Sequence, residues 1–217
     1  MRLLLTTIEN DCIHSKLALK NLYSAVEGSP ADVSVKEYPR EMTTSEIYDD
    51  IVRGDYDIVY FHTNMAISSR IDNIAELVKK AMPVVNIILG GREVSFGTRK
   101  YMEDHPQVDF VFRGYGEMIL FRFVKALLTY SFDFDRIGGL AYRENDEIYV
   151  NDFPENMDYD KIPFPYEQEE LTARDQVYYQ SFRGDADRCA YAQVLPDRSI
   201  SALPLGRVCS ELRYFLI

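Results

Sequence analysis

The stretch Asn86-Ile-Ile-Leu-Gly-Gly91 constrains this chain most, because a short apolar core is followed at once by two glycines. An apolar run bounded by glycine is typical of an inner strand of a parallel sheet, which is covered on both faces. A second unit follows, in which residues 109–113 lead into Gly114-Tyr-Gly116-Glu117. Each glycine removes a Cβ where a strand ends, so a ligand can approach the backbone closely. Because ligands of open α/β sheets bind outside the carboxyl ends of the strands, the sequence predicts a binding edge there.

Strands and helices alternate over the first 130 residues. Apolar residues at helical spacing predict a helix after each strand, and capping patterns at Thr43 with Glu46 and at Ser69 with Asp72 predict two helix starts. The alternation predicts an α/β fold with a doubly wound, parallel, five-stranded sheet, Rossmann-like or flavodoxin-like, in the order 2-1-3-4-5. The predicted strands are 2–8, 33–38 (at an edge), 57–62, 86–89 and 109–113.

The pattern changes after residue 130. Two short alternating runs within 139–150 predict a hairpin, and the acidic, Pro-rich span 151–171 predicts an extended linker. A further strand is predicted at 176–183 and a last helix at 204–217. We therefore divide the chain into a Rossmann domain, a hairpin with linker, and a C-terminal strand, loop and helix, at 1–130, 131–175 and 176–217.

Composition narrows the choice of partners and compartment. The net charge of −11 disfavours nucleic acid, whose phosphates require clustered Lys and Arg. No apolar run reaches the roughly 20 residues of a membrane span, so we expect no membrane partner. Cys12, Cys189 and Cys209 are odd in number and far apart, which predicts a reducing, cytoplasmic location without disulfides. Composition does not predict the oligomeric state.

Four segments in the first 120 residues carry a resemblance, namely Leu3–Thr7, Ile13–Leu19, Ile88–Glu93 and Arg113–Glu117. In this order they resemble the cobalamin (B12)-binding domain that precedes radical-SAM enzymes, a group that includes anaerobic magnesium-protoporphyrin ester cyclases. Ile162–Pro165 and Tyr179–Gly184 resemble the entry to the radical-SAM barrel and its first strand. The resemblance covers nearly the whole chain and implies a corrinoid as the small-molecule partner.

The same resemblance implies a four-iron four-sulfur cluster and S-adenosylmethionine, held by Cys-x3-Cys-x2-Cys. The three aligned positions here are Asp185, Cys189 and Ala192, so Cys189 alone keeps a thiolate. A carboxylate and a methyl group do not replace soft thiolate ligands. The chain also ends after one strand and one helix of a barrel that needs roughly 200 residues. We therefore expect a truncated barrel start that performs no radical chemistry itself.

The resemblance also implies which residues hold the cofactor. Gly90 and Gly91 would allow close approach of the nucleotide tail of cobalamin, which slides alongside such a sheet. His14 is the candidate cobalt ligand, since imidazole is a good donor to cobalt, and the alternative is a solvent-facing histidine at a helix start. His62 ends the third predicted strand and, with Thr63 and Asn64, is a candidate for polar contacts to the corrin amides. The remaining predicted cofactor-binding residues are Thr7, Asn10, Thr63, Asn64, Arg92, Glu93, Gly114, Gly116 and Glu117.

Two other functions stay open. A ligand-free interaction or regulatory domain with a filled cleft is compatible with bulky Met65 and Phe96 near the edge. A phosphoacceptor signalling domain would need a carboxylate at the end of the third strand and a lysine at the end of the fifth. Phe61-His62 and Arg113 stand at those places, so this function is less favoured. For the parent enzyme the resemblance leaves a methyltransferase and an oxidative cyclase as alternatives.

Overall fold

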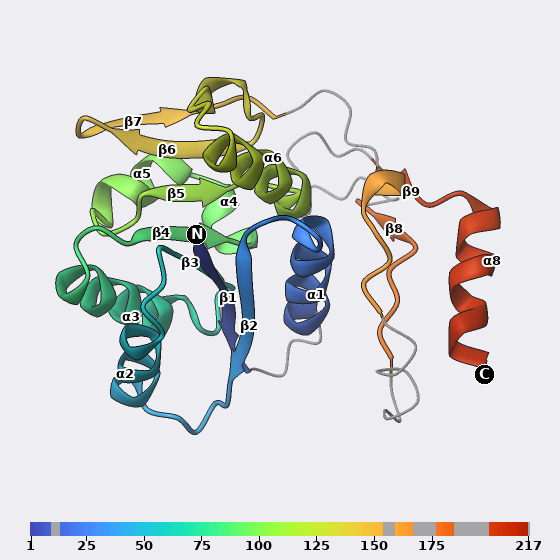
Figure 1. Ribbon diagram of the computed structural model, residues 1–217, viewed down its shortest axis with the longest axis horizontal. Helices are drawn as coiled ribbons and strands as arrows, with labels where there is room; N and C mark the ends of the chain where they lie inside the picture. The colour runs from blue at the N-terminus through green and yellow to red at the C-terminus, as the bar shows by residue number, and fades with distance from the viewer. Residues whose placement is uncertain (10–13, 154–158, 167–176, 185–199, 217) are drawn as a thin grey trace.

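A single mixed sheet with helices on both faces forms the body of the protein in the computed structural model (Figure 1). The structure describes residues 1–9, 14–153, 159–166, 177–184 and 200–216. The strands of the large sheet are β1 (Arg2–Ile8), β2 (Asp32–Tyr38), β3 (Ile58–His62), β4 (Asn86–Gly90), β5 (Phe110–Phe112), β6 (Leu140–Glu144) and β7 (Glu147–Val150).

The strand order is β2-β1-β3-β4-β5-β6-β7. The first five strands are parallel, so the predicted order 2-1-3-4-5 is confirmed for them, with β2 at an edge. The prediction was wrong in treating the hairpin as separate from the sheet. β6 pairs antiparallel with β5, matching Phe110 to Tyr142, and β7 continues the sheet beyond it. The hairpin thereby covers the β5 edge, whose backbone groups would otherwise lack strand partners.

Helices cover the two faces of the sheet in two groups. α1 (His14–Val26) and α6 (Gly116–Leu128) pack on one face, and α2 (Thr44–Gly54), α3 (Ser68–Ala81), α4 (Arg92–Ser95) and α5 (Thr98–Asp104) pack on the other. The leucine run of β1 shows why a strand of this kind is continuously apolar. Leu4 lies in the core under α2 and α3, whereas Leu3 and Leu5 lie in the core under α1 and α6. All three side chains are fully buried.

The helix starts test two predicted caps. The capping box of α2 is confirmed, because the Glu46 amide donates to Thr43 Oγ1 at 3.2 Å and the Thr43 amide donates to Glu46 Oε2 at 2.7 Å. The predicted cap of α3 at Ser69 is wrong, since this helix begins at Ser68 without a side-chain cap. Asp72 instead accepts a hydrogen bond from the Tyr101 hydroxyl, which ties α3 to α5.

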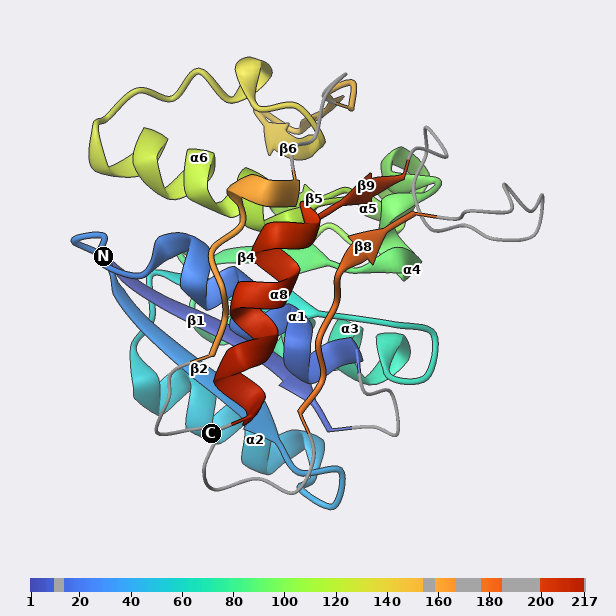
Figure 2. The same ribbon diagram turned by 90° about the vertical axis from the view of Figure 1, so that its right-hand side faces the viewer.

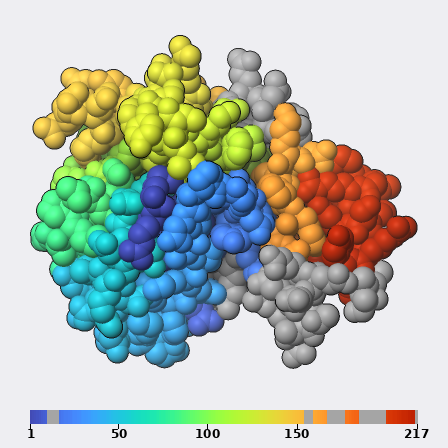
Figure 3. Space-filling model, viewed as in Figure 1, coloured from blue at the N-terminus to red at the C-terminus, as the bar shows by residue number. Residues whose placement is uncertain are grey.

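The C-terminal segment, defined as the described residues 159–166, 177–184 and 200–216, lies beside α1 and α6 (Figures 1 and 2). Its elements are the 3-10 turn η2 (Tyr159–Lys161), β8 (Phe182–Arg183), β9 (Ser201–Ala202), α8 (Leu205–Arg213) and the 3-10 turn η3 (Tyr214–Leu216). Outside this segment, a further 3-10 turn, η1 (Phe134–Arg136), precedes β6. β8 and β9 pair antiparallel, so the strand predicted at 176–183 is reduced to two residues. The space-filling view shows this segment in contact with the surface of α1 (Figure 3). None of the helices in the described ranges is long and apolar enough to cross a membrane.

Candidate functional site at the carboxyl rim of the sheet

The parallel strands bring several of the predicted residues together at one edge, here called the carboxyl rim: Thr7, His62–Asn64, Gly90–Gly91 and Gly114–Glu117. Hydrogen bonds connect its parts. The Thr7 hydroxyl, at the end of β1, donates to the His62 carbonyl at 2.8 Å. The Thr63 amide donates to the Gly90 carbonyl at 2.7 Å, which joins the ends of β3 and β4.

Three consecutive residues at the end of β3 carry buried polar atoms without a hydrogen-bond partner in the described part of the chain. These atoms are His62 Nδ1, Thr63 Oγ1 and Asn64 Nδ2. The Asn64 side chain is held in place through its other polar atom, because Oδ1 accepts from the Ala66 amide at 2.9 Å. A buried polar group left unsatisfied costs roughly 1–3 kcal/mol. Such atoms, gathered at the end of one strand, are therefore suited to binding a polar ligand.

The His62 ring is neutral at physiological pH. Burial is the main cause that lowers its pKa, the Glu117 carboxylate raises it and the Arg183 guanidinium lowers it, and the net pKa is about 4. A neutral imidazole has one N–H donor and one lone pair. His62 can therefore donate or accept a hydrogen bond at the rim without carrying charge into it.

Among the described residues of the rim, Glu117 is the charged side chain that is buried, being 4% exposed. Its carboxylate accepts hydrogen bonds from Arg183 Nη1 at 2.8 Å and Nη2 at 2.5 Å. Burial raises the pKa of Glu117, but the charge and hydrogen bonds of Arg183 outweigh burial and hold it below its usual range. The Arg183 guanidinium also lies over the rings of Tyr159 and Tyr115, at 4.7 and 5.3 Å from their centroids. Glu117 is thus bound to the C-terminal segment.

The rim glycines are closely packed by the protein itself. A Cβ built on Gly90 would lie 2.1 Å from the Tyr60 hydroxyl, and one built on Gly91 would lie 2.0 Å from the Thr63 carbonyl oxygen. Gly91 also has a φ of +121°, which a residue with a side chain rarely adopts. Both positions therefore require glycine for packing reasons that do not depend on a ligand.

The other predicted residues lie further out or outside the described ranges. Arg92 and Glu93 are exposed on α4, and Gly114 is exposed with a φ of +86°. His14 begins α1, but its side chain is not described, and Asn10 lies outside the described residues. The cluster-like positions Asp185, Cys189 and Ala192 also lie outside them. The cofactor contacts proposed for these residues stay predictions.

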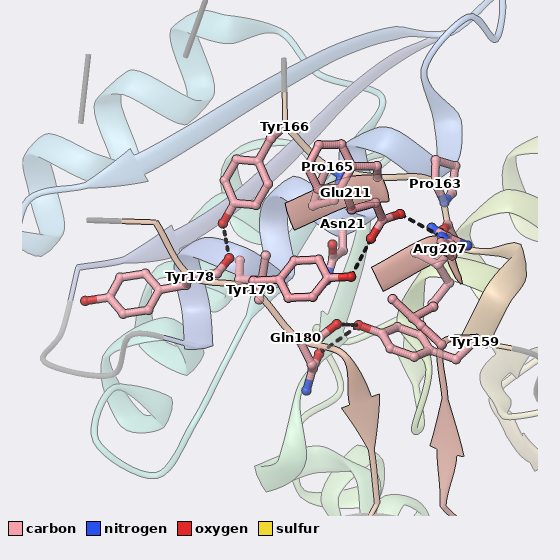
Figure 4. Close-up of a pocket in the computed structure, with 14 residues that line it drawn as sticks. Asn21, Tyr159, Pro163, Pro165, Tyr166, Tyr178, Tyr179, Gln180, Arg207 and Glu211 are labelled. Atoms are coloured by element: carbon pink, nitrogen blue, oxygen red, sulfur yellow. Dashed lines mark hydrogen bonds and ion pairs between the residues drawn. The ribbon is translucent and has the colours of Figure 1, made fainter. Parts of the chain in front are cut away.

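A pocket opens between α1 and the C-terminal segment (Figure 4). It encloses about 300 Å³ of empty space that includes open solvent. Its polar groups pair with each other, since the Tyr179 hydroxyl donates to Glu211 at 2.7 Å and Arg207 Nε donates to Glu211 at 2.6 Å. This volume lies at the lower end of the roughly 300–1,000 Å³ that is usual for drug-sized ligands. A corrinoid is larger than such ligands, so a whole corrinoid is too large for this pocket. Its lining residues are Leu17, Asn21, Tyr159, Ile162, Pro163, Phe164, Pro165, Tyr166, Tyr178, Tyr179, Gln180, Leu203, Arg207 and Glu211.

Comparison with known protein families decides which family has this rim. The model of the B12 binding domain matches residues 1–123, which is more than half of the chain. The chain belongs to the B12-binding domain family. The match covers β1 through most of α6 and therefore includes every element that supplies the carboxyl rim. The family match supports cobalamin as the cofactor of this B12-binding domain.

Curated relatives and solved structures are longer than this chain. An uncharacterized methyltransferase of Pyrococcus horikoshii is 30% identical over 127 residues, which are 58% of this chain and 27% of the relative. An anaerobic magnesium-protoporphyrin IX monomethyl ester cyclase of Cereibacter sphaeroides is 38% identical over 88 residues, 38% of this chain and 14% of the relative. The chain thus spans less than a third of either protein.

The solved structures share the fold over nearly the whole chain. OxsB, a cobalamin-dependent S-adenosylmethionine radical enzyme with aqua-cobalamin and S-adenosylmethionine bound, superposes with a TM-score of 0.75 at 19% identity. The superposition covers 99% of this chain and 31% of OxsB. OxsB with aqua-cobalamin alone gives the same TM-score. The likeness thus extends beyond the B12-binding domain into the C-terminal segment.

Sequence reasoning missed three residues that shape the rim. The sequence pattern predicts Tyr60 only as part of a strand, and nothing in its neighbours indicates that its hydroxyl faces Gly90. Arg183 was noted for its resemblance to a barrel strand, not as the partner of Glu117, 66 positions away. Tyr159 lies in an acidic span that was predicted to be linker, yet it is only 6% exposed. Contacts between positions so far apart leave no local pattern.

Proposed function

We propose that this chain is the corrinoid-binding module of a larger radical-SAM-type protein and that it binds cobalamin at the carboxyl rim. The observation that carries this proposal is the set of buried, unpartnered polar atoms on His62, Thr63 and Asn64 in a B12-binding domain. The amide side chains of a corrin ring offer both donors and acceptors, which match a hydroxyl, an amide N–H and a neutral imidazole. When bound, cobalamin would supply methyl transfer or redox chemistry at its cobalt.

A titration tests the proposal. Hydroxocobalamin is added to the chain, and the visible spectrum is followed to saturation. Thr63→Val removes the orphaned hydroxyl at nearly constant volume, and it should weaken binding about fivefold to tenfold, as expected for one net hydrogen bond. Thr129→Val is the matched control, because the Thr129 hydroxyl bonds only within α6 and its C-terminal turn and is exposed. A spectrum that never saturates with the unchanged chain would refute the proposal.

We also propose His14 as the cobalt ligand, although one residue more separates it from Asp11 than in the Asp-x-His-x-x-Gly pattern of many cobalamin domains. Its place at the start of α1, next to the loop that leaves β1, supports this assignment. Replacing an imidazole on cobalt changes the visible spectrum of the bound corrinoid. His14→Ala should therefore alter the spectrum at saturation, whereas an unchanged spectrum would end the assignment.

We propose further that the chain does not hold a complete iron-sulfur cluster. Of the three aligned ligand positions, Cys189 alone is a cysteine, and one thiolate is too few for a four-iron cluster. Anaerobic reconstitution with iron and sulfide should leave the chain without the broad absorption of such a cluster. The double variant Asp185→Cys with Ala192→Cys is the positive control. A full complement of iron and sulfide on the unchanged chain would contradict the proposal.

The second candidate function is a ligand-free interaction domain. The observation that favours it is the filling of the space at Gly90 and Gly91 by Tyr60 and Thr63. This candidate predicts that neither hydroxocobalamin nor any other corrinoid binds, so the same titration separates the two functions.

A further inference from the structure

One tyrosine fills the space beside two glycines of the rim. A Cβ on Gly90 would lie 2.1 Å from the Tyr60 hydroxyl oxygen, and a Cβ on Gly116 would lie 3.8 Å from the same atom. Tyr60 is 2% exposed, and its ring packs against Phe112 with 5.6 Å between the ring centroids. The Tyr60 hydroxyl therefore occupies the place between the end of β4 and the start of α6.

Neighbouring residues also fill the space around the Tyr60 hydroxyl. On the side of α1, Leu22 Cδ2 lies 3.3 Å from the position of a Gly116 Cβ. At the turn after β4, the Thr63 carbonyl lies 2.0 Å from the position of a Gly91 Cβ. Cores are close-packed, and a planar group can enter beside β4 only if the Tyr60 ring leaves its position.

The unpartnered polar atoms belong to residues that come after Tyr60, at the carboxyl end of β3. They belong to His62, which is the last residue of β3, and to Thr63 and Asn64, which follow it at the carboxyl rim. A ligand that satisfies them would contact the rim from outside the strand ends, which is where ligands of open α/β sheets bind. The unpartnered polar atoms and the Tyr60 ring, which fills the space beside β4, thus both favour a ligand that binds from outside the strand ends.

Building on the proposed corrinoid function, we propose that this chain recognises the corrin ring and its amide side chains at the rim, and that Tyr60 excludes the nucleotide base from the place beside β4. The ligand class is therefore corrinoids with or without a nucleotide. Because the nucleotide makes no contact beside β4, cobinamide, which lacks it, should bind as tightly as cobalamin. This differs from the expectation that the glycines of β4 admit the nucleotide tail.

Parallel titrations with hydroxocobalamin and diaquacobinamide test the proposal on the unchanged chain. The two dissociation constants should agree within about fivefold. A dissociation constant for cobalamin lower than that for cobinamide by more than this factor would overturn the proposal, because the nucleotide would then supply binding energy. If neither corrinoid binds, the corrinoid function itself fails, which is a distinguishable result.

Two variants of Tyr60 give a second test. Tyr60→Leu shortens the side chain and opens the place beside Gly90, so cobalamin should gain at least about fivefold over cobinamide. Tyr60→Phe is the matched control, because the ring carbon Cζ would still lie 2.7 Å from a Gly90 Cβ, and the ratio should stay near one. Circular dichroism verifies that each variant is folded. A folded Tyr60→Leu variant with an unchanged ratio would overturn the role of Tyr60, and the comparison on the unchanged chain stands even if this variant does not fold.

Discussion

Arg183 and Glu117 form a two-pronged ion pair across 66 positions of the chain, with N–O distances of 2.8 and 2.5 Å. Their side chains are only 14% and 5% exposed. The pair joins β8 of the C-terminal segment to the first turn of α6, beside the carboxyl rim. A guanidinium fork matched to a carboxylate is both strong and directional, so it fixes the position of the segment against the B12-binding domain.

Removing one partner of this pair should destabilise the chain strongly. Arg183→Met leaves the Glu117 carboxylate buried without its counter-charge, which costs roughly 3–5 kcal/mol. Urea unfolding followed by circular dichroism measures the change. Arg122→Met is the matched control, since Arg122 is exposed on the same helix as Glu117, and it should change stability little. Equal stability of the two variants would contradict the structural role of the pair.

Acid should destabilise the chain through His62 before it affects Glu117. The folded pKa of His62 is about 4 against an ordinary 6.5, so the unfolded state takes up the proton first as pH falls. Stability contributed by the neutral ring is present above pH 6.5 and is lost progressively toward pH 4, by roughly 3 kcal/mol in all. The pKa of Glu117 is also lowered, so its contribution is lost only at still lower pH, below the ordinary 4.5 of a free glutamate.

Urea unfolding of His62→Gln at several pH values checks this assignment. The unfolding free energy of the unchanged chain should fall between pH 6.5 and 4.5, and the variant should lose most of this slope. The charged groups that act on His62 are Glu117 and Arg183, and both remain in the variant. A variant that keeps the full slope would show that another group titrates there.

Gly90→Ala should destabilise the chain even without a ligand. The new methyl group would lie 2.1 Å from the Tyr60 hydroxyl, so the buried ring must shift, at a cost of roughly 1–3 kcal/mol. Gly206→Ala is the control, because a Cβ there meets nothing within 4 Å. Within α8 that alanine should be neutral or stabilising by roughly 0.5–1 kcal/mol. Thermal unfolding measures the melting temperature of both variants. Equal melting temperatures would contradict the packing role of Gly90.

The two predicted helix caps should respond differently to alanine. Thr43→Ala removes the hydroxyl that accepts from the Glu46 amide in a working capping box, and it should cost about 1 kcal/mol. Ser69→Ala should have almost no effect, because Ser69 lies within α3, is exposed and caps nothing. The difference in urea midpoint between the two variants measures the cap directly, and equal midpoints would contradict the assignment.

Local patterns predicted the body of this fold well. The leucine run of β1 is buried on both faces, and Thr43 with Glu46 caps α2, because both features depend on residues close together in sequence. The parallel order of five strands followed from the alternation of elements. The attachment of β6 to β5 was missed, because pairing between strands is a tertiary choice that short alternating runs do not specify.

The candidate site was predicted only in outline. The sequence placed Thr63, Asn64 and the glycines at one edge, since topology alone brings strand ends together. It did not predict that Tyr60 fills the space at Gly90 or that Arg183 binds Glu117. These contacts depend on side-chain directions and on segments far apart in the chain. The predicted cap at Ser69 with Asp72 was wrong for the same reason, because Asp72 accepts a hydrogen bond from Tyr101 on another helix.

The location of bound corrinoid tests the central claim most directly. Backbone amide chemical shifts of the chain are recorded while hydroxocobalamin is added to saturation. The account predicts the largest shift changes at residues 62–64 and 114–117, with α2 and α3 almost unaffected. Saturable binding that leaves the amides of 62–64 and 114–117 unchanged, or the absence of any binding, would contradict a corrinoid site at the carboxyl rim.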